Sequence, residues 1–415
     1  MFVPWTDGIN ILDRVGPSSV HELIHGCSLK VLLSSFNNAD QCPRGINLHP
    51  NAFIGTIIHK LHEAARKNNP SNNGEAWTIA FANTVLETIT AQQQEAISEN
   101  PIDRHLPQLR GLRSYERCVA ALFSSVQING GLPNHVAHDH SSSTTYHHRL
   151  VGAEIDVWDL ECTWPANLTN QHAPSFWLKG QIDLVEVDAE GRYSIVDWKT
   201  GRYFDSLSGE LNQTYVTQLK LYAQMWIQTA FHRHGLEIPI SELRLFLDGS
   251  EGRCEVEKDG SFELLQNARQ VIQSVNEVVE NQALTYAISD ALANPEPTSC
   301  KYCLWRTGCN PYLSVLESEG GFLEDGFDLI GSVYSLPILN AVGSTEYQLK
   351  IQTTDDTIWL VDNIHAQWVE GQTFSLGDEV GFFSGVEINN TSRANYDRRF
   401  RLNHFQHALF QRGIG

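Results

Sequence analysis

Apolar residues in the first third of the chain recur every three or four positions, which is the period of an amphipathic helix. Residues 17–36 open with serines that can cap a helix, and Glu22 follows at capping-box spacing. Asn51 can cap a second helix that carries a stripe of apolar side chains. Further helices are expected within residues 74–127. The chain therefore begins with a helical region.

From residue 150 the period of apolar side chains changes to two, which is typical of strands. A turn over residues 188–191 joins two of these segments as a hairpin. We expect three strands, a helix, a strand and a helix, in that order, at about 151–160, 176–187, 193–199, 211–233, 242–248 and 262–288. Elements in this order predict an α/β core.

A break rich in glycine and acidic residues, at about 316–328, separates this core from a different pattern. The rest of the chain consists of short alternating segments, which predict a small all-β barrel, plausibly of the OB type. Several small barrels share this pattern. We divide the chain into a first domain, residues 1–315, and an OB-like β-barrel domain, residues 322–415.

The net charge of −20 argues against a protein that coats nucleic acid without specificity. An enzyme of this charge that acts on nucleic acid would need a local basic groove, or a partner protein that delivers the enzyme to its substrate. The N-terminus shows no basic and apolar leader, and no apolar run reaches the length of a membrane span. These features predict a soluble, cytoplasmic protein without a membrane partner.

Two acidic residues and a lysine fall on adjacent predicted strands. Residues two apart on a strand face the same side, so Asp197 and Lys199 project together. Asp183 lies on the preceding strand, and the tight turn is expected to bring it close to Asp197. Two carboxylates held so close repel one another, which favours a divalent cation between them. Lys199 can orient or activate a water and offset charge that develops on a phosphate.

Three of the eight cysteines form a close group with the spacing C-x2-C-x5-C. In a reducing compartment such a group more often binds a metal than forms disulfides. Cys300, Cys303 and Cys309 can supply three ligands of a [4Fe–4S] cluster, or bind Zn²⁺ with a fourth ligand. No histidine at zinc-finger spacing lies near them.

Four short motifs, taken in order, resemble those of the RecB-type branch of the PD-(D/E)xK nucleases. That branch typically shows G-x-x-x-H on a helix, G-x-x-D and D-x-K-T-G on strands, and Q-x-x-x-Y on a helix. The matching residues here are Gly55 to His59, Gly180 to Asp183, 197–201, and Gln218 to Tyr222. The resemblance covers about residues 1–312 and implies a restriction-endonuclease-like α/β core with a helical N-terminal region.

The resemblance implies a divalent metal at the acidic residues. Asp183, Asp197, His59 and the backbone carbonyl of Trp198 would bind Mg²⁺ or Mn²⁺, and Lys199 would serve the attacking water. The implied reaction is metal-assisted hydrolysis of DNA phosphodiester bonds.

Further residues would complete this site. Gln218 and Tyr222 lie one helical turn apart and would line the site toward the DNA. Glu154 stands where related enzymes often carry an acidic residue on the first strand. His62 lies on the same helical stripe as His59 and is an alternative to it.

The spacing of the cysteine triplet resembles that of the AddB nuclease and of the CRISPR-adaptation exonucleases. There the fourth thiolate comes from a helix ahead of the nuclease core, a place that Cys27 holds here, although no proline follows it. Cys42, which Pro43 follows, is the alternative fourth ligand. The implied [4Fe–4S] cluster would be a clasp for the two ends of the nuclease domain, and a structural zinc site is the alternative.

As a whole, the resemblance implies a metal-dependent deoxyribonuclease that acts on DNA with single-stranded character, in repair, recombination or antiphage defence. The sequence contains no Walker motif, so we expect a helicase or another protein subunit as partner. The barrel could bind single strands, dock a partner or form an oligomer. The alternative function is a catalytically weak scaffold or nucleic-acid-binding subunit, which the acidic net charge favours.

Two polar segments stand apart from these motifs. Residues 393–401 interleave cations with aromatics, which indicates either contact with single strands or an ordinary ion-paired strand. Residues 131–148 are rich in histidine and serine without fixed spacing, which predicts a disordered insertion rather than a metal site.

Overall fold

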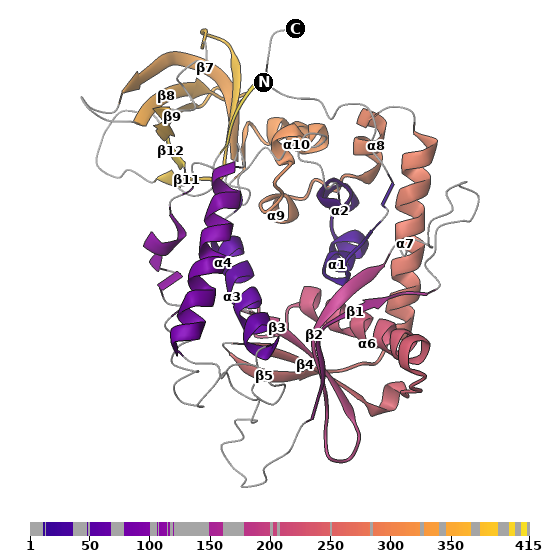
Figure 1. The fold of residues 1–415 in the computed structure, drawn as a ribbon. Helices are drawn as coiled ribbons and strands as arrows, with labels where there is room; N and C mark the ends of the chain where they lie inside the picture. Colours follow the sequence, from indigo (N-terminus) through magenta and orange to yellow (C-terminus); the bar gives the residue numbers. More distant parts are fainter. Residues whose placement is uncertain are drawn as a thin grey trace.

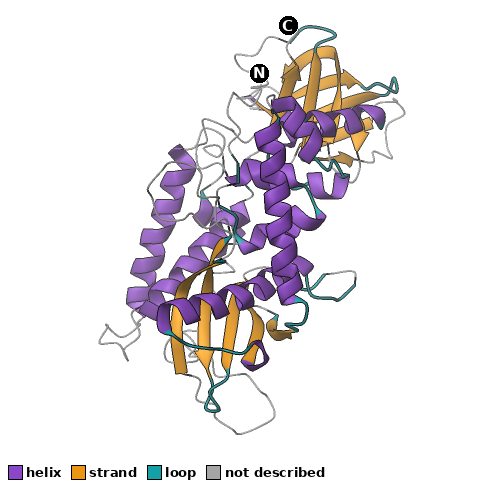
Figure 2. Cartoon of the chain, turned by 90° about the vertical axis from the view of Figure 1, so that its right-hand side faces the viewer, coloured by secondary structure: helices purple, strands orange, loops and turns teal. Residues whose placement is uncertain are grey.

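The protein is a mixed α/β structure with two β-sheets. Figure 2 shows the sheets at opposite ends of the molecule, with helices between them. The computed structural model describes residues 11–12, 14–35, 48, 50–67, 79–99, 106, 108–113, 115–116, 119, 149–160, 178–199, 202–205, 208–249, 251–282, 285–323, 328–339, 346–366, 374–388, 398–402 and 408–412.

Two short helices, rather than one, occupy the first helical segment: α1 (Pro17–His25) and α2 (Ser28–Ser35). The helix breaks at Gly26, where an added Cβ would lie 2.6 Å from the Glu22 carboxylate. Glu22 accepts a hydrogen bond from the Cys27 amide at 3.2 Å and forms no capping box. The predicted cap was wrong, because α1 starts from Gly16 with Pro17 in its first turn.

The next helices pack on one another and enclose a small core of their own. They are α3 (Pro50–Lys67), α4 (Ile79–Glu99) and the 3₁₀ turn η2 (Leu109–Gly111). Asn51 lies inside α3 instead of capping it, since Pro50 already suits the first helical position. The side chains of Ile54, Ile57 and Leu61 are buried in this core. It is separate from the core beneath the sheet.

The first sheet has five strands in sequence order, and Figure 1 shows it at the end of the molecule away from the C-terminus. Its strands are β1 (Arg149–Trp158), β2 (Lys179–Val187), β3 (Tyr193–Lys199), β4 (Leu243–Gly249) and β5 (Gly252–Val256). Only β3 and β4 run parallel, and α6 (Gln213–His234) connects them. The other neighbouring strands pair antiparallel. Strand β5 was not foreseen from the sequence.

Helix α6 lies against the core of this sheet and has well-formed ends. The Asn212 side chain accepts a hydrogen bond from the Thr214 amide at 2.9 Å, and Gly235 ends the helix in the left-handed region. Helix α7 packs beside α6, and the segment expected as one helix to residue 288 ends earlier, at Asn281. The elements that follow are α7 (Ser261–Asn281), α8 (Thr285–Leu292), α9 (Pro297–Cys300), η4 (Arg306–Gly308) and α10 (Asn310–Ser318). A second 3₁₀ turn, η3 (Ile240–Glu242), precedes β4.

The C-terminal part is a sheet of eight strands with the order β11-β12-β9-β8-β7-β10-β13, and β6 also pairs with β7. The strands are β6 (Phe322–Leu323), β7 (Asp328–Leu339), β8 (Glu346–Gln352), β9 (Ile358–His365), β10 (Glu379–Phe383), β11 (Gly385–Ile388), β12 (Arg398–Leu402) and β13 (Ala408–Arg412). Its core is built around Trp359, Phe382 and Phe400.

The expected barrel is not seen closed in this sheet. Among the described strands, the path of hydrogen-bonded neighbours ends at β11 on one side and at β13 on the other. The sheet is joined to the rest of the molecule through the core, since Ile330 and Phe383 belong to the large apolar cluster that also contains residues of the first sheet, of α6 and of α10.

None of the described helices combines the length and the apolar character needed to cross a membrane.

Candidate active site and cysteine pocket

The two predicted carboxylates lie on neighbouring strands of the first sheet. Leu184 pairs with Val196 in this antiparallel pair of strands. Their neighbours Asp183 and Asp197 therefore lie opposite one another, on the side of the sheet that carries α6. Asp183 Oδ2 accepts a hydrogen bond from the Trp198 amide at 2.7 Å. The hairpin that joins β2 and β3 thus brings the acidic residues together.

Helix α6 contributes an amide that connects the other polar groups. Gln218 Nε2 donates to Asp197 Oδ1 at 3.2 Å, and Gln218 Oε1 accepts from Lys199 Nζ at 3.0 Å. The same Nε2 donates to the Tyr222 hydroxyl at 3.1 Å, one turn further along the helix. The structure therefore brings Asp183, Asp197, Lys199, Gln218 and Tyr222 into one group of contacts.

Asp197 is the most buried acid of this group, with 3% of its surface exposed. Its Oδ2 contacts the Lys199 ammonium but accepts no well-directed hydrogen bond. The pKa of Asp197 is raised to about 7, chiefly by burial; Lys199 opposes the shift, and Asp183 adds to it. A buried carboxylate beside a second carboxylate is an environment in which a cation would be stabilising.

The approach of α6 to the sheet depends on Gly180, the glycine of the G-x-x-D motif. A Cβ added there would lie 2.7 Å from Tyr222 Cε1 and 2.8 Å from Pro17 Cδ. Burial, and then the nearby Asp197, raise the pKa of Tyr222 above its ordinary value, so its hydroxyl stays protonated. The glycine lets α1, α6 and β2 meet directly behind the acidic residues.

The remaining residues predicted for this site are less closely tied to it. His59 is half-buried on α3, a helix that contacts β1, while the side chains of His62 and Glu154 lie outside the described residues. Over the part of the chain that the structure describes, no three His, Cys, Asp or Glu side chains form a group ready to hold a metal ion. His59 is thus not shown to join Asp183 and Asp197.

Tyr215 is a site residue that the sequence motifs missed. Its ring lies 4.4 Å from Lys199 Nζ, measured from the ring centre, in cation–π contact. It precedes Gln218 by three residues on α6, so both side chains lie on the helix face toward Lys199. That helical spacing was the one signal in the sequence from which Tyr215 could have been found.

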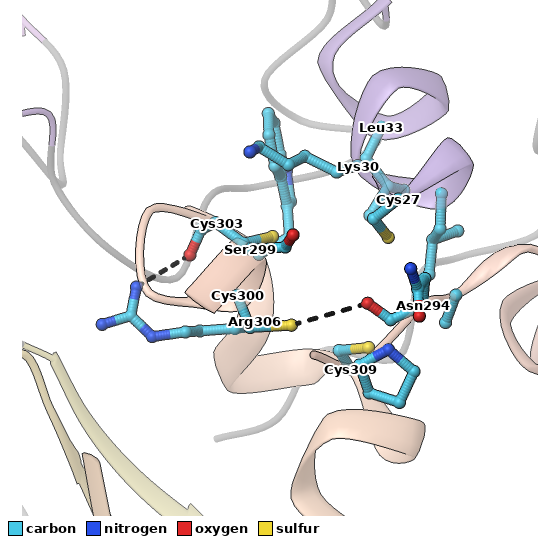
Figure 3. A pocket seen from close by; sticks show the side chains of 13 residues that line it. Cys27, Lys30, Leu33, Asn294, Ser299, Cys300, Cys303, Arg306 and Cys309 are labelled. Atoms are coloured by element: carbon cyan, nitrogen blue, oxygen red, sulfur yellow. Dashed lines mark hydrogen bonds between the residues drawn. The ribbon is translucent and has the colours of Figure 1, made fainter. Parts of the chain in front are cut away.

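The four predicted cysteines line one pocket, which Figure 3 shows from close by. Cys27 comes from the junction of α1 and α2, and the other three come from the segment between α8 and α10. All four are free thiols and buried. Segments nearly 300 residues apart in the sequence therefore meet at this pocket. The alternative ligand Cys42 lies outside the described residues.

The pocket favours the protonated form of Cys300, Cys303 and Cys309 when no cation is bound. Burial raises the pKa of Cys303 to about 11 and of Cys309 to about 12, and raises that of Cys300 further still. Neighbouring cysteines add to the shift, because a second thiolate would repel the first. Bound metal would reverse this preference, since thiolates are the form that ligates.

The cationic run near the C-terminus is only partly described, from Arg398 onward. Arg398 forms two hydrogen bonds with the Glu387 carboxylate, both 2.8 Å long, and stacks over the Trp359 ring at 4.3 Å. Arg399 pairs with Asp362 at 2.7 Å. These contacts favour the interpretation as an ion-paired strand over that of a nucleic-acid contact.

A family model agrees with this geometry. The family model described as "PD-(D/E)XK nuclease superfamily" matches residues 17–310. The curated proteins include no match. Among solved structures, the chain is similar to one described as "Crystal structure of SSO0001", with 13% identity over 54% of this chain and 81% of that one, at a TM-score of 0.24. The matched range contains both the acidic group and the cysteine pocket, and the chain belongs to the PD-(D/E)XK nuclease superfamily.

Proposed function

We propose that the chain is a deoxyribonuclease that depends on Mg²⁺ or Mn²⁺. Membership of a superfamily of nucleases supports this reaction class. The observation that carries the proposal is the pair of carboxylates on β2 and β3 beside the Lys199 ammonium. A carboxylate as buried as Asp197, beside a second carboxylate, favours a cation bound during function in addition to the ion pair with Lys199.

Each polar side chain has a proposed role. Asp183, Asp197, the Trp198 carbonyl and His59 would hold the cation, which supplies a water of lowered pKa and offsets charge on the phosphate. Lys199 would hold the attacking water, and Gln218 keeps the ammonium at 3.0 Å from its own carbonyl oxygen. The Tyr222 hydroxyl accepts a hydrogen bond from the Gln218 amide nitrogen and so helps to hold that side chain. Tyr222 and Gln218 would together line the path of the DNA.

The test is cleavage of end-labelled DNA, single- and double-stranded, with Mg²⁺, with Mn²⁺ and with a chelator. Asp197→Asn and Lys199→Ala should each lower the rate by roughly 100-fold or more, because each removes a group that acts on the reacting atoms. Lys220→Ala is the matched control, since Lys220 lies on α6 and its ammonium donates to the Asp259 carbonyl at 2.9 Å.

A second readout separates lost chemistry from lost folding. Mg²⁺ or Mn²⁺ should raise the melting temperature of the wild type and of the control, and should leave that of Asp197→Asn unchanged. Equal cleavage by wild type, Asp197→Asn and Lys199→Ala would overturn the enzyme proposal. It would favour the alternative of a catalytically weak scaffold, for which the net charge of −20 speaks.

For the cysteine pocket we propose a [4Fe–4S] cluster held by Cys27, Cys300, Cys303 and Cys309. The donor set fits, because four thiols from two distant segments face one pocket. A single zinc ion would need sulfur atoms about 4 Å apart, from its Zn–S distance. Among the described residues no three ligands form a group ready for one ion, and a structural zinc site is the alternative proposal. Visible absorption and metal analysis of anaerobically purified protein distinguish iron from zinc.

We propose, further, that residues 322–415 form an OB-like barrel domain after a nuclease domain over residues 1–315. The support is the connection of strands: β10 pairs with β7, β11 pairs with β12, and only Ser384 separates β10 from β11. The chain therefore passes directly from β10, which pairs with β7, to β11, which is the strand at one end of the sheet. Nucleic-acid partners of such a domain would be single-stranded.

The cellular setting is likewise a proposal. A chain of this charge is expected to work with a helicase or another subunit that brings DNA to it, in the cytoplasm, during repair, recombination or antiphage defence. Co-purification of a tagged chain with partner proteins from its own cells tests this setting, and gel filtration tests for an oligomer.

A further inference from the structure

A buried arginine stands between the cysteine pocket and the C-terminal sheet. Arg306 lies in the chain between Cys303 and Cys309, lines the pocket, and has 2% of its surface exposed. Its ion-pair partner, Asp328, is fully buried at the first position of β7. Figure 3 shows Arg306 at the pocket beside Cys303, and its ion pair with Asp328 extends the same guanidinium to the C-terminal sheet.

The contacts of this arginine reach both sides. Toward the pocket, one terminal nitrogen of Arg306 donates to the Cys303 carbonyl at 2.9 Å. Toward the sheet, Nε and the other terminal nitrogen donate to the two carboxylate oxygens of Asp328, at 2.7 and 3.1 Å. That second nitrogen also donates to the Ser384 hydroxyl at 2.6 Å. The planar guanidinium is suited to this forked geometry, which a lysine ammonium cannot reproduce.

Asp328 is held by further donors, so the ion pair is part of a closed network. The Tyr312 hydroxyl on α10 donates to Oδ2 at 2.5 Å, and the Ser384 amide donates to Oδ1 at 2.8 Å. Ser384 has a φ of 62°, a left-handed conformation that a serine rarely adopts. Both its amide and its hydroxyl serve the network in that conformation. Four segments, η4, α10, β7 and the β10–β11 junction, thus meet at one carboxylate.

A metal centre that only held the two ends of the nuclease domain together would not require such a network. Buried ion pairs are costly to desolvate and often contribute no more stability than apolar packing, but in some proteins they fix one geometry. Here the geometry fixed is the position of the cysteine segment relative to β7. Apolar contacts follow the same junction, since Ile330 and Phe383 belong to the same apolar cluster as Cys300 and Cys309.

We propose that Arg306 is a positioning residue that couples the occupied cysteine pocket to the docking of the C-terminal sheet. A metal centre that draws the cysteine segment together holds the Cys303 carbonyl and the guanidinium in place, and the guanidinium holds Asp328. Loss of the metal loosens the segment and releases β7. This inference rests on the proposed metal centre at the four cysteines.

Hydrogen exchange of the full-length protein, with the metal bound and after its removal by chelation, tests the coupling. The amides of residues 328–333 in β7 should exchange roughly tenfold faster after metal removal, while those of β3 and β4 keep their rates. Arg306→Lys should show the fast β7 exchange with the metal still bound, and a faster loss of visible absorption on exposure to chelator. Asp328→Asn should do the same, and the double variant should add little.

Arg269→Lys is the matched control. Arg269 forms a forked pair with buried Asp159, both bonds 2.6 Å long, away from the cysteine pocket. This variant should change β7 exchange no more than exchange elsewhere, and its absorption should decay as in the wild type. Tyr312→Phe removes a single hydrogen bond of the network and replaces the arginine variant if that one does not fold.

The outcomes separate this inference from the proposed metal centre. Wild-type protein that binds neither iron nor zinc overturns the metal centre, and the coupling with it. Protein that binds the metal, but whose β7 exchange is the same with and without it, overturns the coupling alone. Additive effects of Arg306→Lys and Asp328→Asn on β7 exchange also overturn the coupling.

Discussion

Gln218 is the residue on which the arrangement of the candidate active site depends. Its amide oxygen and nitrogen contact Lys199, Asp197 and Tyr222 at once. An amide is suited to this position because it both donates and accepts, and it adds no charge to a site that already holds two carboxylates and an ammonium. The side chains of β3 are thereby oriented by a helix that the sequence places well after them.

Tyr215 supports the ammonium from another side, and this contact leads to a prediction. Tyr215→Leu should lower the rate of DNA cleavage roughly twofold to thirtyfold, because a cation–π contact is worth about 0.5–2 kcal/mol and its loss leaves the Lys199 ammonium less firmly positioned. Single-turnover cleavage at saturating Mg²⁺ measures the effect. Tyr215→Phe keeps the ring and should retain nearly the full rate; an equal loss in both variants would contradict the role given to the ring.

At the scale of single elements, the hairpin of β2 and β3 carries the acidic residues. The Asp188 side chain holds the turn of this hairpin through hydrogen bonds. Asp188 Oδ1 accepts from the amides of Glu190 and Arg192, and Oδ2 accepts from Arg192 Nε at 2.7 Å. Burial would raise the pKa of Asp188, but the hydrogen bonds and the charge of Arg192 outweigh it and lower the pKa. The ionised carboxylate therefore stabilises the turn.

The pH dependence of stability should reveal this carboxylate. An acid whose folded pKa lies below its unfolded value of 3.8 contributes stability above that value, and the contribution is lost as pH falls through the folded pKa. Asp188→Asn should therefore lower the melting temperature at neutral pH, and the difference from wild type should shrink below about pH 4. A difference that stays constant across this range would show that Asp188 acts without its charge.

The contact of β2 with α1 and α6 gives a second prediction at this scale. Gly180→Ala should destabilise the protein by roughly 1–3 kcal/mol, because its Cβ would overlap Tyr222 and Pro17, both held in packed surroundings. Thermal or urea unfolding measures the loss. Gly111→Ala is the control, since a Cβ there would meet nothing within 4 Å. A neutral Gly180→Ala would mean that α6 can shift away from the sheet without cost.

At the scale of the whole molecule, the acidic net charge is expected to weaken the binding of DNA. With a net charge of −20, the chain alone should bind single-stranded DNA weakly, near the 10⁻⁴ M end of the range for non-specific binding at physiological salt. Fluorescence anisotropy with Lys199→Ala protein, Mg²⁺ present, measures the affinity without cleavage. Submicromolar binding would contradict the need for a partner, and would point to a basic groove within the chain.

The sequence by itself determined the superfamily of this protein and most of the elements that carry its candidate site. The period of two along residues 193–199 placed Asp197 and Lys199 on one side of a strand, because side-chain alternation is a local property of the backbone. The motif order predicted the superfamily, which the family model confirms. Some predictions from local sequence were wrong or missing. Glu22 accepts a hydrogen bond from the Cys27 amide instead of capping α1, and strand β5 was not foreseen.

Only the tertiary structure decided which distant groups meet. No periodicity could show that Tyr215 lies over Lys199, or that Arg306 reaches from the cysteine pocket to Asp328 on β7. Such contacts depend on how α6 crosses the sheet and how η4 packs on the second sheet, and those placements follow from the burial of whole faces rather than from neighbours in the chain. Sequence therefore specified the reactive groups, while packing determined their partners.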